Sequence, residues 1–285
     1  MAQRSVALVI SPSRQEALAA AQELVPLLSA AGIALYTISD VEISGVTKCI
    51  HSQLPDLEAA IVLGGDGTIL RAGEITLMRN IPLLGINMGH VGFMAEVNRP
   101  TIAAIADCII NANYVTENRM VLGFAVQRDG KEIGSGWALN EVTVERDGTT
   151  MVELFVEIDS RPLSHWGCDG LICSTPTGST AYAFSAGGPV VWPEVDALVL
   201  LPISAHALFS RPMVVSPKSE IIVTIESTDA LLSADALRKL PLKKGDKVHI
   251  TRSSQVIKLS HVSKTLFTDR LVAKFKLPVE GWRGE

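Results

Sequence analysis

The stretch AAIVLGGDGTILRAGEITLM, residues 59–78, decides the fold of the first part of the chain. It opens with five apolar residues, a length typical of a strand that is buried on both faces of a sheet. Residues 69–78 then carry the apolar spacing of a helix. The tetrapeptide GGDG at 64–67 joins the two directly. The stretch therefore predicts one strand–turn–helix unit of an open, mainly parallel sheet.

The same alternation of strand and helix extends on both sides of this unit. Short apolar runs that predict strands alternate with longer segments of helical spacing. The predicted strands cover residues 5–10, 33–38 and 82–86, and the predicted helices cover residues 14–31 and 101–111. We therefore expect an α/β N-terminal domain over residues 1–115.

Near residues 113–119 the pattern changes to short runs in which every second residue is apolar. Such runs, separated by turn signals such as Asp129-Gly130, are typical of an all-β domain. We expect a sandwich-like C-terminal domain over residues 116–263. Helical spacing returns near the end of the chain, and we expect residues 264–285 to return to the N-terminal domain and pack on it.

Composition and charge exclude several classes of partner. The chain of 285 residues has a net charge of −5, and no block of lysine and arginine could neutralise a nucleic-acid backbone. No apolar run reaches the ~18 residues of a membrane span, and no signal peptide is evident. The four cysteines form no metal-binding set, so we expect reduced thiols in a cytoplasmic protein. A mean hydropathy of +0.30 fits a large core or an extensive subunit interface.

The tetrapeptide at 64–67 combines a phosphate cradle with a carboxylate. Glycine lets the backbone approach a ligand closely, and N–H groups at a helix N-terminus favour an anion. Asp66 would repel a phosphate unless it holds Mg²⁺ or accepts a proton from an attacking hydroxyl. The alternative is that Asp66 only caps the helix. The residues that follow exclude a Walker A loop, and the spacing of the glycines does not support a Rossmann dinucleotide site.

Two later segments carry polar groups that are suited to a nucleotide. Asn140 and Glu141 are adjacent, and neighbours on a strand point to opposite faces. The strand must therefore bend or end there if both are to contact one ligand. An amide can pair with an adenine edge, and a carboxylate can accept hydrogen bonds from ribose hydroxyls. Residues 174–182 hold six hydroxyl groups, which could surround a polar ligand.

Together these motifs resemble the NAD kinase family. GGDGT at 64–68 resembles the signature of a superfamily that contains NAD kinases, diacylglycerol and sphingosine kinases, and 6-phosphofructokinases. GINMGHVGF at 85–93, ALNEV at 138–142 and DGLICSTPTGSTAY at 169–182 resemble NAD kinases specifically. The resemblance covers most of the chain. It implies transfer of a phosphoryl group from ATP or polyphosphate to the 2′-hydroxyl of the adenosine ribose of NAD, which produces NADP.

The resemblance also implies which residues form the site. Asp66 would be the catalytic base, and Mg²⁺ or another divalent cation would be bound mainly through the donor phosphates, without protein metal ligands. The implied phosphate-binding residues are Gly64, Gly65, Gly67 and Thr68. The implied NAD-binding residues are Asp66, Gly67, Arg71, Phe93, Asn140, Glu141, Asp169, Thr180, Ala181, Tyr182 and Ser185. Members of the family are homodimers or homotetramers, which implies self-association here.

Two other functions stay open at this point, and one loop departs from the family pattern. A lipid kinase of the same superfamily would share the phosphate loop but has no need for the Asn140-Glu141 pair. A non-catalytic dinucleotide sensor would bind NAD without producing NADP. After Asp235, many relatives carry Gly or Ser followed by Gln or Arg, where this chain has Ala236-Leu237. We therefore assign no ligand contact to this loop.

Overall fold

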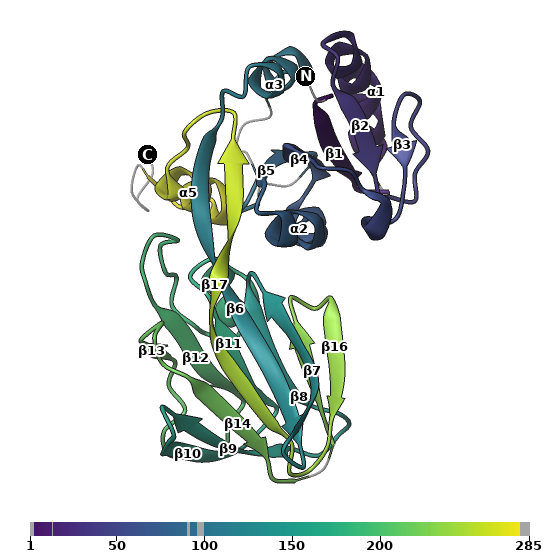
Figure 1. The fold of residues 1–285 in the computed structure, drawn as a ribbon. Coiled ribbons are helices and arrows are strands. Elements are labelled where there is room, and N and C mark those ends of the chain that lie inside the picture. The colour runs from purple at the N-terminus through teal and green to yellow at the C-terminus, as the bar shows by residue number, and fades with distance from the viewer. Residues whose placement is uncertain (1–2, 13, 90–91, 96–99, 228, 280–285) are drawn as a thin grey trace. The chain divides into compact units, whose positions relative to one another are not determined.

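The structure is a computed structural model that describes residues 3–12, 14–89, 92–95, 100–227 and 229–279. It divides into two compact units (Figure 1). Unit 1 comprises Met1–Asn118 and Ile257–Glu285, and unit 2 comprises Arg119–Val256. The boundaries expected from the sequence were 115/116 and 263/264. Both divisions in the structure fall inside long strands, which carry no turn signal that would mark them in the sequence.

Unit 1 is built on a parallel sheet. Its strand order is β17-β5-β4-β1-β2-β3, and each described pairing in it is parallel. Its strands are β1 (Ser5–Ile10), β2 (Ala34–Thr37), β3 (Thr47–Lys48), β4 (Ala59–Gly64), β5 (Pro82–Asn87) and the end of β17 (Lys247–His261). Its helices are α1 (Gln15–Ala30), α2 (Asp66–Arg79), α3 (Ile102–Ile110) and α5 (Phe267–Phe275), with the short 3₁₀ turn η1 (His51–Gln53).

The central strands of unit 1 are mostly apolar because both of their faces are covered. All residues of β1 and β4 are buried. Helices α1 and α3 share one apolar cluster with one face of these strands. On the other face, Ile69 of α2 packs closely on Gly85. A Cβ built on Gly85 would lie 2.6 Å from the side chain of Ile69. Helix α5 returns the end of the chain to this unit, as expected.

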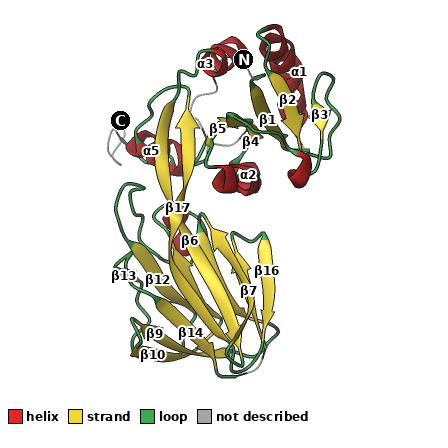
Figure 2. Cartoon of the chain, viewed as in Figure 1, coloured by secondary structure: helices red, strands yellow, loops and turns green. Residues whose placement is uncertain are grey.

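Unit 2 is a sandwich of two sheets in which each described pairing is antiparallel. One sheet has the order β10-β9-β14-β17, to which the β6–β7 hairpin adds, and the other has the order β13-β12-β11-β8-β15-β16. Alternate residues from both sheets form one core around the fully buried Trp166. Figure 2 shows that strands make up nearly all of this unit.

The elements of unit 2 are short, apart from the two strands that continue into unit 1. The strands are β6 (Val115–Arg128), β7 (Lys131–Ala138), β8 (Glu141–Arg146), β9 (Val152–Ile158), β10 (Arg161–Cys168), β11 (Gly170–Ser174), β12 (Leu198–Ile203), β13 (Met213–Val215), β14 (Ile221–Ile225), β15 (Ala230–Ala234) and β16 (Arg238–Leu242). One helical turn, η2 (Gly178–Thr180) followed by α4 (Tyr182–Ser185), interrupts them.

Three features bear on the classes of function considered above. None of the helices in the described ranges is long and apolar enough to span a bilayer. All four cysteines are free thiols, and three of them are buried. In the described part of the chain, no three His, Cys, Asp or Glu side chains gather where they could hold a metal ion.

The turn between β15 and β16 holds two residues in the left-handed region that favours glycine. Asp235 has φ 53° and Ala236 has φ 56°. The N–H of Leu237 donates to the Ala234 carbonyl at 3.0 Å, which closes a type I′ turn. This turn prefers Asn or Asp at its first central position and Gly at its second. Asp235 therefore fits its position, whereas the Cβ of Ala236 strains the backbone.

We expect Ala236→Gly to raise the free energy of unfolding by about 1 kcal/mol, because glycine removes the left-handed strain at an exposed position. Urea unfolding measures the change. Ala103→Gly is the matched control, since Ala103 is exposed in α3 and the same substitution there should lower stability by about 1 kcal/mol. A loss of stability at both positions would contradict the interpretation of strain at Ala236.

Candidate active site

The turn between β4 and α2 places Asp66 at the first position of the helix. Gly65 is the N-cap residue, and no side chain caps the helix there. The carboxylate of Asp66 instead accepts the backbone N–H groups of Phe93 at 3.0 Å and Met94 at 3.3 Å. These residues follow β5, the neighbouring strand of the sheet. Asp66 is therefore not a local cap, because its side chain is fixed by a second glycine-rich segment.

Glycine is required on both sides of this carboxylate. A Cβ at Gly92 would lie 2.2 Å from Oδ1 of Asp66, and a Cβ at Gly64 would lie 2.4 Å from Oγ1 of Thr68. Contacts this short do not occur in folded proteins, so a side chain at either position would displace the group that it meets. The two glycine-rich segments therefore form one structure around Asp66.

The N–H groups of the turn are not equally available to a phosphate. The N–H of Thr68 already donates to the Gly65 carbonyl at 2.9 Å, and Thr68 is buried. Gly67 is exposed and Gly65 is partly exposed, so their N–H groups lie at the open N-terminus of α2. The helix dipole favours an anion at this point. A donor phosphate would therefore meet Gly65 and Gly67 before Thr68.

Arg14 adds a cation beside this turn. Its Nη1 donates to the Met88 carbonyl at 2.7 Å. A Cβ built on Gly65 would lie 3.7 Å from its Nη2. The guanidinium thus lies next to the glycines, although the sequence alone did not single it out. Arg71, which the resemblance implied as an NAD-binding residue, is exposed on α2.

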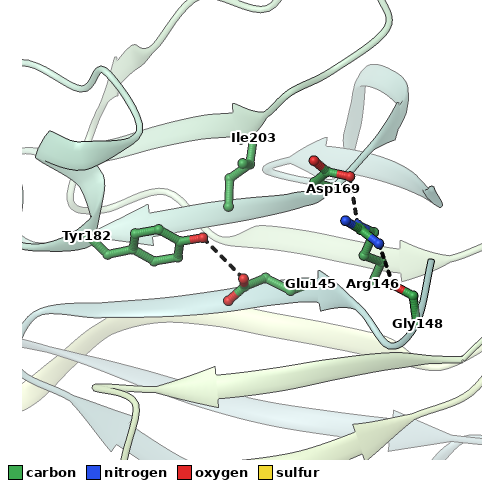
Figure 3. Close-up of a pocket in the computed structure, with 6 residues that line it drawn as sticks. All are labelled: Glu145, Arg146, Gly148, Asp169, Tyr182 and Ile203. Atoms are coloured by element: carbon green, nitrogen blue, oxygen red, sulfur yellow. Dashed lines mark hydrogen bonds and ion pairs between the residues drawn. The ribbon is translucent and has the colours of Figure 1, made fainter. Parts of the chain in front are cut away.

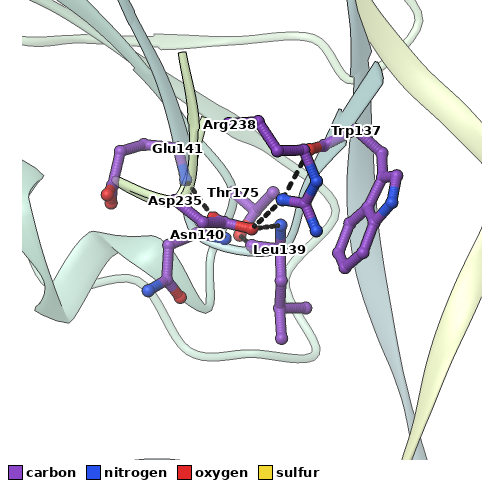
Figure 4. Close-up of polar contacts among 7 residues, drawn as sticks. All are labelled: Trp137, Leu139, Asn140, Glu141, Thr175, Asp235 and Arg238. Atoms are coloured by element: carbon purple, nitrogen blue, oxygen red, sulfur yellow. Dashed lines mark hydrogen bonds and ion pairs between the residues drawn. The ribbon is translucent and has the colours of Figure 1, made fainter. Parts of the chain in front are cut away.

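In unit 2, β8 begins at Glu141, so Asn140 lies just before the strand. The backbone around this pair is held by Asp235, whose carboxylate accepts the N–H groups of Leu139 at 2.8 Å, Asn140 at 2.7 Å and Glu141 at 3.3 Å. The three N–H groups converge because the chain bends at this point, as Figure 4 shows. The bend lets the side chains of Asn140 and Glu141 leave the backbone on the same side of the picture.

Asp235 is in turn paired with Arg238. Nη1 of Arg238 lies 3.3 Å from the carboxylate and donates to the Trp137 carbonyl at 3.1 Å. The guanidinium also stacks on the Trp137 ring, 3.7 Å from its centroid. The loop that the sequence left without a function is thus the support of the Asn140-Glu141 pair.

Glu141 is a buried carboxyl with an unused hydrogen-bonding atom. Its side chain is 6% exposed, and its Oε2 has no hydrogen-bond partner within the described residues. Burial, together with the neighbouring charge of Asp235, raises the pKa of Glu141 to about 8, although the backbone N–H of Tyr182 stabilises the ionised form. A buried polar atom without a partner is costly, so Oε2 is poised to bond with a ligand.

A cavity of about 370 Å³ lies between β8 and the segment that follows β11. Figure 3 shows its two polar pairs, the Tyr182 hydroxyl 3.2 Å from Oε2 of Glu145, and Nε of Arg146 2.7 Å from Oδ1 of Asp169. Tyr182 and Asp169, both implied by the resemblance, therefore line one cavity. Glu145 and Arg146 were not expected there.

Most of the chain matches the two models that describe the NAD kinase family. Residues 6–114 match the ATP-NAD kinase N-terminal domain, and residues 139–262 match the ATP-NAD kinase C-terminal domain. The chain belongs to the NAD kinase family. It is 43% identical to the NAD kinase of Thermobifida fusca, with 99% of this chain and 92% of that protein covered. It is 42% identical to the NAD kinase of Mycobacterium tuberculosis, with 100% and 99% covered.

Two solved structures share the fold of this NAD kinase family member. Yeast NADH kinase complexed with NADH has a TM-score of 0.87 at 21% identity, covering 99% of this chain and 90% of that chain. An NAD kinase from Archaeoglobus fulgidus in complex with ATP has a TM-score of 0.71 at 24% identity, covering 95% and 98%. These similarities confirm the two-domain fold of an α/β and a β-rich domain.

The hydroxyl-rich run of this NAD kinase sequence is mostly internal. Ser174, Thr175 and Ser179 are fully buried. Oγ1 of Thr175 donates to the Leu139 carbonyl at 2.5 Å, and Oγ of Ser179 donates to the Pro176 carbonyl at 2.7 Å. The expectation that these hydroxyls surround a ligand was wrong for these three residues, because each donates to a backbone carbonyl of the protein instead: Ser174 to Asn140, Thr175 to Leu139 and Ser179 to Pro176.

The remaining residues that the NAD kinase resemblance implied are placed as follows. Thr180 and Ala181 are partly exposed at the end of η2, and Ser185 is exposed at the end of α4. Phe93 is 6% exposed and packs against the rings of Phe267 and Phe275. Contact of these four residues with NAD stays a prediction.

We expect Glu141→Gln to change how stability depends on pH. Glu141 loses its proton near pH 4.5 when unfolded and near pH 8 when folded. The folded state therefore binds more protons between these values, and the stability of the unaltered chain falls across this window by up to about 1.4 kcal/mol per pH unit. Below the window this contribution to stability is fully present.

Glutamine cannot ionise, so the difference in stability between Glu141→Gln and the unaltered chain should grow in favour of the variant from pH 5 to pH 8. Urea unfolding at a series of pH values measures it. Glu194→Gln, the same change at an exposed carboxyl of unit 2, is the control for the substitution itself. Parallel stability curves for Glu141→Gln and the unaltered chain would contradict the raised pKa.

Proposed function

We propose that the chain transfers a phosphoryl group from ATP or polyphosphate to the 2′-hydroxyl of the adenosine ribose of NAD, with Asp66 as the general base. The placement of Asp66 carries this proposal. It lies at the open N-terminus of α2, next to exposed glycine N–H groups, and two backbone N–H groups fix its carboxylate. Membership of the NAD kinase family supports NAD as the acceptor and NADP as the product.

The proposed chemistry is an in-line displacement. Asp66 accepts the proton of the 2′-hydroxyl as its oxygen attacks the terminal phosphorus, and the bond between that phosphorus and the donor's bridging oxygen breaks. N–H groups of the 64–68 turn, with the adjacent guanidinium of Arg14, stabilise the charge on the donor phosphates. Asn140 and Glu141 would bind the adenosine part of NAD, and Oε2 of Glu141 is the acceptor that still lacks a partner.

We propose Mg²⁺, or another divalent cation, as the cofactor. Mg²⁺ keeps several waters and binds nucleotide phosphates with one or two carboxylates at most. The residues around the turn fit that demand, because the exposed Gly67 and partly exposed Gly65 offer N–H groups to the donor phosphates that would bind the ion. A metal held by donor phosphates would neutralise charge that develops during transfer.

We also propose that the enzyme is a cytoplasmic homodimer or homotetramer. Apolar side chains along residues 182–209 are unusually exposed, with Leu208 fully exposed and Phe209 56% exposed. Exposed apolar surface of this kind marks protein interfaces. The four free thiols fit a reducing compartment.

The test is NADP formation by the purified chain with ATP, other nucleoside triphosphates and polyphosphate compared side by side, each with Mg²⁺ or with chelator. We expect NADP with at least one of these donors, and loss of activity in chelator. Parallel arms use NADH and diacylglycerol as acceptors. Phosphorylation of diacylglycerol but not NAD would favour a lipid kinase. NAD binding without NADP under every condition would favour a dinucleotide sensor.

A further inference from the structure

We propose that Arg270 of α5 is a positioning residue that aims the Asp66 carboxylate through a single peptide group. This inference rests on the proposed role of Asp66 as the base. Arg270 is 1% exposed, and its Nη1 donates to the Phe93 carbonyl at 3.0 Å. The N–H of Met94, which belongs to the same peptide group as that carbonyl, donates to Oδ1 of Asp66 at 3.3 Å.

The geometry of a trans peptide explains how the connection works. The C=O and the N–H of one peptide group lie in a plane and point in opposite directions. Arg270 therefore holds the Phe93–Met94 peptide from one side, and Asp66 is bound from the other. A charged donor on the carbonyl also polarises the peptide and strengthens the hydrogen bond that its N–H makes.

Further contacts fix Arg270 and the segment that it holds. Nη2 of Arg270 donates to Nε2 of His261, at the end of β17, at 3.0 Å. The Phe93 ring lies 5.8 Å from that of Phe267 and 5.7 Å from that of Phe275, both on α5. Helix α5 thus contacts Phe93 twice, by ring packing on its side chain and by a hydrogen bond to its carbonyl. The N–H of Phe93, which donates to Oδ2 of Asp66, is held in place by the same contacts.

The consequence for catalysis follows from the precision that proton transfer demands. A shift of about 1 Å caused by a change away from the reacting atoms can cost about 10²-fold in rate. Arg270 is bonded to the backbone that orients Asp66, so its loss should lower kcat. It should raise the KM for NAD far less than it lowers kcat, because the Asn140-Glu141 pair is held by Asp235 rather than by α5.

A double-mutant cycle tests the inference, with kcat and KM measured for the unaltered enzyme, Arg270→Met, Asp66→Asn and the double variant. We expect Arg270→Met to lower kcat by about 10²-fold when Asp66 is present. In the Asp66→Asn background it should lower kcat by less than about 3-fold, because the group that it positions is already lost. Lys274→Met, an exposed change on the same helix, is the control and should leave kcat unchanged.

Each outcome decides a separate question. Equal losses in both backgrounds would make Arg270 a structural residue only and overturn this inference, while the proposed function would stand. Near-normal turnover of Asp66→Asn would remove the proposed base and this inference with it. If Arg270→Met is recovered unfolded by circular dichroism, the cycle is run with Arg270→Gln, which keeps a polar side chain but removes the charge. The same non-additivity is expected there, and additive losses would again overturn the inference.

Discussion

Asp66→Asn is expected to lower kcat by about 10²–10⁴-fold, the range that a positioned general base contributes. Asparagine keeps the size of the side chain and one oxygen that can accept the N–H of Phe93 or Met94. It cannot take a proton from an attacking hydroxyl. The variant should therefore fold and bind NAD with an affinity close to that of the unaltered enzyme, because the effect falls on the chemical step.

The measurement combines steady-state NADP formation with calorimetric binding of NAD. Asp56→Asn, the same substitution at an exposed position of unit 1, is the matched control and should leave turnover unchanged. Near-normal kcat in Asp66→Asn would remove Asp66 from the role of base. Loss of NAD binding together with turnover would instead assign it to substrate binding.

Asp235→Ala is expected to lower the free energy of unfolding by about 3–5 kcal/mol, which is the cost of removing one partner of a buried ion pair. The substitution leaves the N–H groups of Leu139, Asn140 and Glu141 without their acceptor and leaves Arg238 beside an empty site. The backbone that carries the Asn140-Glu141 pair would then relax. Affinity for NAD should fall together with stability.

Urea unfolding and calorimetric NAD binding measure both effects. Asp235→Asn should be intermediate, because its amide oxygen can still accept one or two of the N–H groups. Asp229→Ala removes an exposed carboxylate from the start of the same hairpin and should change neither quantity appreciably. If Asp235→Ala lowers stability but leaves NAD affinity unchanged, Asp235 stabilises the fold without supporting NAD binding.

Periodicity predicted the fold well where local residues decide it. Strands β1 and β4 of unit 1 are buried along their whole length, whereas strands of unit 2 bury alternate residues. Each pattern reflects how many faces of the strand are covered. An all-β domain was expected up to residue 263. The parallel pairing of β17 with β5 was not expected, because a pairing of Ser260 with Leu84 leaves no signal in the neighbouring sequence.

The site was predictable where a motif is local and was missed where it is not. Asp66 stands out in the sequence because a carboxylate among glycines needs a function. Asp235 binds the Asn140-Glu141 backbone from a turn that is distant in sequence, and no pattern near Asp235 predicts those partners. The orientation of hydroxyl groups could not be predicted either. The sequence does not show whether Thr175 faces a ligand or, as found, donates to the Leu139 carbonyl.

Unit 1 is assembled from both ends of the chain, whereas unit 2 is one continuous segment. During synthesis on the ribosome, residues 119–256 can fold as soon as they emerge, because every strand of their sandwich is then present. The first 118 residues must wait, since the end of β17 and α5 arrive last. A protein truncated before Arg270 would thus keep a complete sandwich but would lose the contacts that α5 makes with Phe93.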